Sequence, residues 1–203
     1  MSDSHAHAEI PFTTEVRPDT GLTNPKLGIW LFLASEVMLF GSLFSSYALL
    51  RSGAMSWPDQ SSIVNVPLAA VNTVILIASS VVILRATAAL RGGDVARFRA
   101  LMATTATLGI VFLAIKSIEY RGELAEGLRP STNNFVGLYF VMTFLHAMHV
   151  TGGVLVNLFL CAPGMVMNRR DAPRFLGRVE AATLYWNFID VIWILMFVVL
   201  YLL

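Results

Sequence analysis

Long apolar stretches separated by short polar connections dominate this sequence. Five of them approach or exceed the roughly 20 residues that a helix needs to cross a bilayer. They are residues 27–50, 66–84, 100–118, 135–161 and 181–203. Runs of this length without period-two alternation exclude a barrel, the only other backbone arrangement that is satisfied in lipid. The pattern predicts an all-α polytopic membrane protein, a bundle of five transmembrane helices.

The third stretch is the least uniform. Its uncharged part ends at Ile115, so we expect the side chain of Lys116 to extend toward the far interface. A polar tail, residues 1–26, precedes the membrane domain of residues 27–203 and contains three prolines. His5 and His7 in this tail could bind a metal, but a solvated tail is the simpler interpretation.

Composition supports the membrane assignment. The 203 residues are 56% hydrophobic and only 13% charged, and the mean hydropathy is +0.69. A net charge of +1 gives no strong field for nucleic acid, which is not an expected partner. A single cysteine, Cys161, excludes a disulfide framework and a cysteine-based zinc site. The first apolar run starts only at Leu27 and is too long for a signal peptide, so insertion by the chain's own helices is expected.

The distribution of Lys and Arg predicts the orientation, because cytoplasmic connections carry the excess. The tail and the second and fourth connections hold ten such residues, and the other side holds four. The ten are Arg17, Lys26, Arg85, Arg91, Arg97, Arg99, Arg169, Arg170, Arg174 and Arg178; the four are Arg51, Lys116, Arg121 and Arg129. We therefore expect a multi-pass membrane protein with a cytoplasmic N-terminus and a C-terminus outside.

Ionisable residues inside the spans are the candidate functional groups, since a charge at the bilayer centre is costly and rarely retained without a role. Four qualify: Glu36, His146, His149 and Asp190. Glu36 and Asp190 each lie nine residues into their spans, about 13 Å deep. His146 and His149 share one helix face. Similar depth predicts one buried polar cluster.

A structural role competes with chemistry at each of these positions. The carboxyl groups could simply hydrogen-bond helices together, and the histidines could do the same. Two histidines on one face do not suit a haem between two axial ligands, and a di-iron site would need Glu-x-x-His on paired helices. We therefore expect no catalytic residue, no metal and no cofactor in this chain.

Small and aromatic residues suggest packing. Gly41, Ser42, Ser45 and Ser46 in the first span, Ala78, Ser79 and Ser80 in the second, and Gly152 and Gly153 in the fourth predict close helix contacts. Trp30, Tyr47, Trp57, Tyr120 and Tyr201 fall near span ends and are interpreted as interfacial anchors.

Several motifs resemble those of haem-copper oxidase subunit III, and together they cover residues 27–203. Residues 180–193, which include Tyr185-Trp186-Asn187-Phe188-Ile189-Asp190, resemble the family's last helix. Ala34-Ser35-Glu36 resembles the segment with an intramembrane carboxylate. His146-Ala147-Met148-His149-Val150 is similar to the His-x-x-His-Val stretch, and residues 116–120 to the Glu-Tyr end of a helix.

This resemblance implies a non-catalytic subunit of a respiratory terminal oxidase in the bacterial inner membrane. Only the whole complex would act as an oxidoreductase and translocase. It would stabilise the catalytic subunit I, contact other oxidase subunits, and support proton uptake and sustained turnover. Haem and copper would lie in partner subunits, and structural phospholipids would bind this chain. Arg169, Arg170 and Trp186 are the candidate lipid contacts.

Two departures and several alternatives stay open. Longer relatives have seven helices, with two before the equivalent of residues 27–50, and Asn187 stands where the family's last helix typically has His. A quinol oxidase subunit III and an accessory protein of nitric oxide reductase are alternatives; the Ser35-Glu36 pair favours cytochrome c oxidase. An independent transporter is disfavoured because no proline interrupts a span away from its edges.

Overall fold

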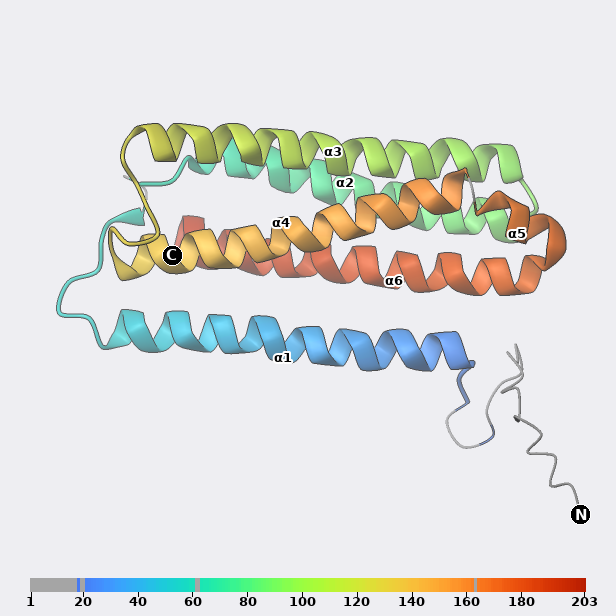
Figure 1. Ribbon diagram of the computed structural model, residues 1–203, viewed down its shortest axis with the longest axis horizontal. Coiled ribbons are helices and arrows are strands. Elements are labelled where there is room, and N and C mark those ends of the chain that lie inside the picture. The colour runs from blue at the N-terminus through green and yellow to red at the C-terminus, as the bar shows by residue number, and fades with distance from the viewer. Residues whose placement is uncertain (1–17, 19–20, 61–62, 163) are drawn as a thin grey trace, which may run out of the picture.

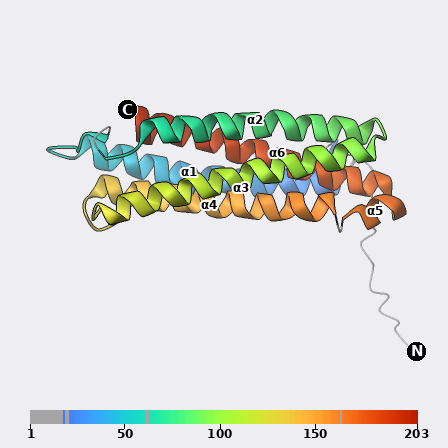
Figure 2. The same cartoon turned by 90° about the horizontal axis from the view of Figure 1, so that it is seen from above.

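The computed structural model describes residues 18, 21–60, 63–162 and 164–203. Five long helices run side by side along the long axis of the described chain (Figures 1 and 2). They are α1 (Asn24–Ser52), α2 (Val66–Arg91), α3 (Val95–Ala125), α4 (Asn134–Cys161) and α6 (Ala172–Phe197), which the π-helical turn η2 (Val198–Leu202) continues; α5 (Met165–Arg170) is short. All five long helices are apolar and long enough to cross a membrane. The predicted five-helix architecture is confirmed, and the tail histidines lie outside the described residues.

Polar residues just before the helices explain where the helices begin. The side chains of four N-cap residues each accept a hydrogen bond from the backbone N–H three residues later. These residues are Asn65, Asp94, Asn133 and Asp171. Helix α3 therefore begins five residues before its apolar stretch, and it continues to Ala125. The apolar pattern locates the part of a helix that lies in lipid, whereas the caps set its full length.

The two ends of the bundle collect different connections. One end holds the α1–α2 and α3–α4 connections and the chain's C-terminus, and we call it the C-terminal end (Figure 1). The other holds the start of α1, the α2–α3 turn and α5; we call it the N-terminal end. In that turn Gly93 has a φ of 80°, a left-handed conformation that favours glycine. Helix α1 packs on α4 and α6 at the edge of the bundle.

Two glycines create the space for the largest side chain of the core. A Cβ atom at Gly109 or at Gly153 would lie 2.7 Å from the ring of Trp186. Trp186 is 1% exposed between α3 and α4. At Gly41 of α1, by contrast, an added Cβ meets nothing within 4 Å. Close packing through small residues is thus observed at Gly153, but not at Gly41 within this chain.

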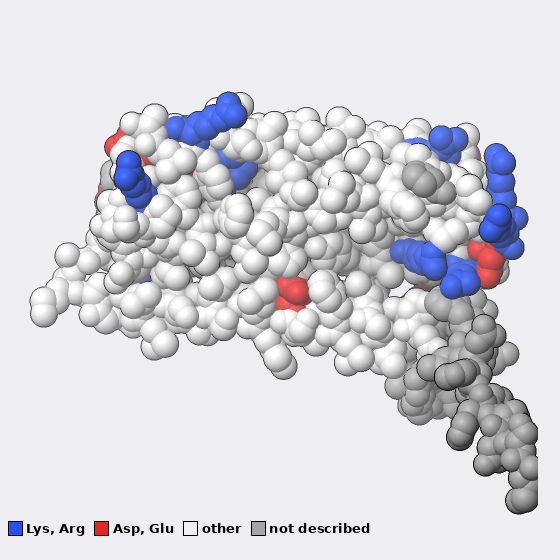
Figure 3. Space-filling model, viewed as in Figure 1, with Lys and Arg blue, Asp and Glu red and all other residues white. Residues whose placement is uncertain are grey.

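The surface is divided into an apolar middle and charged ends. Figure 3 shows Lys and Arg side chains gathered at the two ends, with an almost uncharged band between them that an isolated acidic patch interrupts. Exposed apolar side chains such as Met38, Leu31 and Ile118 lie on the helices. Such a surface suits a hydrocarbon environment or a partner that is itself in the membrane.

Candidate functional site

Glu36 and His149 form a pair between α1 and α4 in the middle of the bundle. The Nε2 atom of His149 lies 2.9 Å from Oε2 of Glu36. Glu36 is 8% exposed, and the ring of Phe40 packs edge-on against the imidazole at a centroid distance of 5.4 Å. The pair therefore joins the edge helix to the bundle at mid-membrane depth.

The hydrogen bonds of His149 show where its protons lie. Its Nδ1 atom is 2.8 Å from the carbonyl oxygen of Leu145. A carbonyl oxygen only accepts, so Nδ1 carries a hydrogen. Nε2 is the nitrogen that faces Oε2 of Glu36, a buried oxygen for which no hydrogen-bond partner is found among the described residues.

His146 makes a different contact, although it lies only one turn away. Its Nε2 atom is 3.1 Å from the carbonyl oxygen of Ile189 on α6, to which it donates. The ring packs between Phe112 and Trp193, with centroid distances of 5.7 and 5.1 Å. His146 is fully buried and joins α4 to α6.

Asp190 belongs to a polar seam between α2 and α6. Ser80 donates a short hydrogen bond to Oδ2 of Asp190, and Ser79 lies 3.5 Å from the same atom. Along the seam, the indole of Trp186 donates to Ser79 at 2.9 Å. The seam continues in two further contacts, from Trp193 to Thr73 at 3.0 Å and between Thr87 and Thr183 at 2.7 Å.

The four predicted residues thus occupy two places. Glu36 and His149 are in direct contact, whereas Asp190 bonds to α2. His146 bonds to the backbone of Ile189, next to Asp190 in the chain. The seam uses Ser79 and Ser80, two of the small residues of the second span, as hydrogen-bond donors to Asp190 of α6. Asn187 stands where the last helix of the resembled family typically has His. Its side chain donates to the carbonyl oxygen of Thr183 in its own helix at 2.8 Å.

A second polar cluster, which the sequence analysis missed, lies toward the C-terminal end. Nζ of Lys116 donates to Oε2 of Glu119 at 3.0 Å, to the hydroxyl of Tyr139 at 2.7 Å and to the hydroxyl of Tyr201 at 2.6 Å. Glu123 accepts from Tyr139 at 2.6 Å. We call these five residues the Lys116 cluster; it joins α3, α4 and η2.

The cluster corrects two expectations. Lys116 is 2% exposed and does not extend to the interface; three hydrogen-bond acceptors and the aromatic rings around it keep its ammonium group inside the bundle. Tyr201 and Tyr47 are buried rather than interfacial, and Tyr47 donates to the carbonyl oxygen of Val199 at 3.2 Å. The available signal was the spacing of Lys116, Glu119 and Glu123, which places all three on one helix face.

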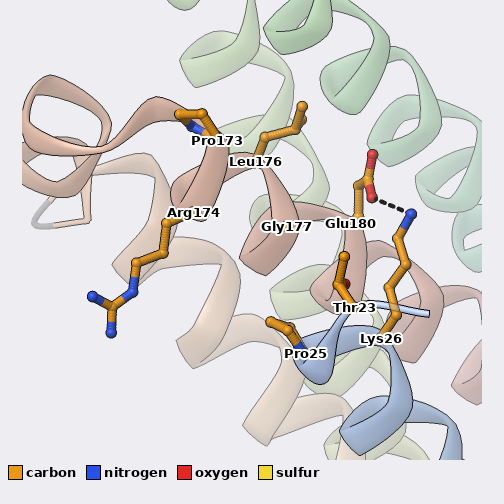
Figure 4. Close-up of a pocket in the computed structure, with 8 residues that line it drawn as sticks. All are labelled: Thr23, Pro25, Lys26, Pro173, Arg174, Leu176, Gly177 and Glu180. Carbon is orange, nitrogen blue, oxygen red and sulfur yellow. Dashed lines mark ion pairs between the residues drawn. The ribbon is translucent and has the colours of Figure 1, made fainter. Parts of the chain in front are cut away.

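Ion pairs and hydrogen bonds also hold the two ends of α1. At the N-terminal end, Lys26 pairs with Glu180 at 3.0 Å, and Arg91 pairs with the same carboxylate at 2.8 Å. Figure 4 shows the Lys26–Glu180 pair beside a cavity of about 190 Å³, with Arg174 pointing away from it. At the other end, Arg51 donates to the carbonyl oxygen of Leu203 at 2.6 Å.

Two of the three candidate lipid contacts are exposed, and the third is buried in the core. Arg169 and Arg170 are exposed in the last turn of α5, at the N-terminal end. Trp186 is 1% exposed and donates to Ser79, so it presents almost no surface to a lipid in this chain. Its place in the core is explained by packing against two glycines.

The described residues offer little to a metal or haem. Among them, no group of three or more His, Cys, Asp or Glu side chains is arranged to hold a metal ion. Both ring nitrogens of His149 already have partners, and one of the two in His146 does. These side chains therefore do not fit a ligand set, which needs nitrogen lone pairs directed at one point.

The fold and its polar contacts define a polytopic helical protein whose buried ionisable groups bond to polar groups inside the bundle. Comparison with known proteins assigns the family. Residues 13–203 match the family model of cytochrome c oxidase subunit III. The chain belongs to this family, and is accordingly a subunit III of the haem-copper oxidases.

Relatives cover most of the chain. Cytochrome c oxidase subunit 3 of Thermostichus vulcanus is 40% identical over 177 residues, 87% of this chain and 86% of the relative. The protein of the same name in Bacillus sp. strain PS3 is 31% identical, over 97% of each chain. Cytochrome bo(3) ubiquinol oxidase subunit 3 of Pseudomonas aeruginosa is 30% identical, over 100% of this chain and 94% of the relative. The family therefore includes oxidases of both names.

Proposed function

We propose that this chain is the non-catalytic subunit III of a bacterial cytochrome c oxidase, and that it packs beside the catalytic subunit I. The observation that carries this is the family match over residues 13–203. Haem and copper belong to the partner subunits. The role of this chain is to keep the catalytic subunit active during turnover and to support its proton uptake.

The outer face of α1 is the proposed contact with subunit I. Glu36 points into the bundle, whereas Gly41, Ser42, Ser45 and Ser46 are exposed. The acidic and small-residue positions thus lie on different faces of α1. A stripe of small residues lets another helix approach closely, which is how membrane helices gain packing energy without a hydrophobic driving force.

Cytochrome c, not quinol, is the proposed electron donor of the complex. The higher identity to a cytochrome c oxidase subunit, 40% against 30% for the bo(3) relative, supports this. The experiment is to purify the complex by a tag on this chain, record its optical spectrum and identify its subunits. Oxidation of reduced cytochrome c is expected; oxidation of quinol alone would favour the alternative.

Anionic phospholipid is the second proposed partner, bound at the N-terminal end in the cytoplasmic leaflet. The exposed Arg169 and Arg170 support this, since each basic residue near an anionic surface adds about 1 kcal/mol. Lys116 was counted on the opposite side but is buried in the bundle. The excess of Lys and Arg at the N-terminal end is therefore larger than the sequence count gave. Cysteines placed at positions 92 and 172 test the orientation: labelling from the periplasmic side should fail, and efficient labelling would invert the topology.

Loss of the chain tests its role most directly. A complex prepared without it should keep its haems, because none of their ligands come from this chain, and should begin turnover normally. Its oxygen consumption should then decay faster over many turnovers as contacts and lipids are lost. Equal lifetimes with and without the chain, or a missing haem signal, would show that the role is different.

A further inference from the structure

The Lys116 cluster contains one more carboxylate than ammonium groups. Lys116 carries one positive charge, and Glu119 and Glu123 could carry two negative charges. All three are at most 6% exposed. An unbalanced charge in such a place is costly, because the low-dielectric interior disfavours it unless a counter-charge is close. The second negative charge of this cluster therefore needs a counter-charge or a proton.

The neighbouring groups do not supply an obvious counter-charge. The titratable or charged side chains around the cluster come from α1, the α1–α2 connection, α3, α4 and η2. They are Tyr47, Arg51, Asp59, Tyr120, Glu126, Tyr139 and Tyr201. Arg51 is the one cation in this set, and it donates to the hydroxyl of Tyr47 and to the carbonyl oxygen of Leu203.

The hydrogen bonds of the cluster leave one oxygen unused. The three ammonium hydrogens of Lys116 have three acceptors. Tyr201 donates to Oε1 of Glu119 at 3.0 Å, so both oxygens of Glu119 accept. Tyr139 has a single hydroxyl proton, and its shortest contact is to Oε1 of Glu123 at 2.6 Å. The other oxygen of Glu123, Oε2, is buried and has no hydrogen-bond partner among the described residues.

A cavity connects this part of the cluster to the exterior. It has a volume of about 250 Å³ and is lined by Glu119, Glu123 and Glu126 of α3 and by Asn65 and Leu68 at the start of α2. A water molecule occupies about 30 Å³ of liquid, so the cavity can hold several. Glu126 is exposed at its mouth. Water at the C-terminal end can therefore approach the side chain of Glu123 without crossing the apolar band, although Oε2 itself is covered from solvent.

We propose that the Lys116 cluster is a proton-binding site, with Oε2 of Glu123 as the acceptor and the Glu126 cavity as the route of exchange. A hydronium ion in the cavity gives up one proton and leaves as water, and an O–H bond forms on Glu123. The cluster, with Lys116 included, then has no net charge. Tyr139 then bridges the protonated carboxyl group to the ammonium group. The site is distinct from the Glu36–His149 pair. It lies toward the C-terminal end of the bundle, whereas α1 starts at the N-terminal end.

The geometry favours a proton over a metal cation. A Ca²⁺ or Mg²⁺ ion takes six or more oxygen ligands. Both oxygens of Glu119 are already engaged by Lys116 and Tyr201, and no group of three acidic or histidine side chains converges among the described residues. One free carboxyl oxygen beside a fixed ammonium group suits a single proton.

Infrared difference spectroscopy of the intact oxidase complex tests the proposal. Spectra recorded between alkaline and acidic buffer should show a carbonyl-stretching band of a protonated carboxyl group that moves to lower frequency in D₂O. Glu123→Gln should remove this band, because the amide cannot titrate. Asp94→Asn is the matched control, since it removes an exposed carboxylate at the N-terminal end of the bundle while asparagine can still cap α3; the buried band should remain.

Two further measurements decide the remaining cases. Tyr139→Phe removes the hydrogen bond to Oε1 of Glu123 and should shift the band to higher frequency without abolishing it, which tests the assignment even if Glu123→Gln does not assemble. A band that is unchanged in both variants would refute the proposal. So would a carboxylate band that responds to added Ca²⁺ in place of acid, which would make the cavity a cation site.

Discussion

The edge helix α1 and the Lys116 cluster hold buried charges in opposite ways. α1 is attached to the bundle by separate polar contacts along its length: Lys26 with Glu180, Glu36 with His149, and Arg51 with the last residue. In the Lys116 cluster five polar side chains from three elements bond to one another and are almost fully buried. The first arrangement leaves the outer face of α1 open, and the second fixes α3, α4 and η2 relative to one another.

Removing the ammonium group from the Lys116 cluster should have the largest effect. Lys116→Met leaves two carboxylates and two hydroxyls around an apolar side chain, and breaking a buried ion pair in this way costs about 3–5 kcal/mol. We expect the free energy of unfolding to fall by this amount, as measured by denaturant titration of the purified chain in mixed micelles.

The control for this prediction is the same substitution in the edge helix. Lys26 is about 40% exposed in its pair with Glu180, and exposed pairs contribute only about 0–1 kcal/mol. Lys26→Met should therefore leave the unfolding midpoint nearly unchanged. Equal losses in the two variants would mean that the cluster does not stabilise the bundle more than the edge contact does.

Packing distinguishes the same two regions. Gly153→Ala places a Cβ atom 2.7 Å from Trp186, and overpacking of this kind costs about 1–3 kcal/mol. Gly41→Ala in α1 meets nothing within 4 Å and should be neutral in the isolated chain. Thermal unfolding of both variants measures the difference.

The same pair of variants also tests the proposed interface. If the stripe at Gly41 contacts subunit I, Gly41→Leu should leave the isolated chain folded but reduce its co-purification with subunit I. Full retention of the complex in this variant would place the interface elsewhere on the chain.

The comparison also shows what the sequence could predict. The five spans follow from hydropathy, and the rarity of mid-membrane charge singles out Glu36, His146, His149 and Asp190. The single cluster expected of these four is divided, because only Glu36 and His149 are in contact with each other. The Lys116 cluster was missed because Lys116, Glu119 and Tyr201 lie near span ends, where charged and aromatic residues usually meet the interface. Their burial depends on α4 and η2 arriving at the same point, and that tertiary arrangement is not encoded in the periodicity of any one helix. The partner of Asp190 likewise depends on which helix lies beside α6.

Removing the acidic group of the mid-membrane pair should have a moderate effect. In Glu36→Gln the amide can still donate to Nε2 of His149, so the contact is retained while the carboxyl group is lost. A hydrogen bond contributes about 0.5–1.5 kcal/mol, which bounds the expected loss of stability. Oxygen reduction by the complex should continue, with slower proton uptake or a shorter active lifetime. Complete loss of oxygen reduction in an assembled complex would show that Glu36 has a direct role in the reaction.

The smallest expected effect concerns the exposed charges beside the start of α1, which should bind lipid without stabilising the fold. Arg170→Ser should weaken binding of the chain's complex to anionic lipid by about 1 kcal/mol, and less in high salt because exposed charges are screened. Lipid retained by the purified complex, measured by native mass spectrometry, reports this. Arg129→Ser is the matched control, because Arg129 is also exposed but lies at the C-terminal end. A larger loss of anionic lipid in Arg129→Ser than in Arg170→Ser would reverse the proposed orientation, and would place the Lys116 cluster nearer the cytoplasmic face.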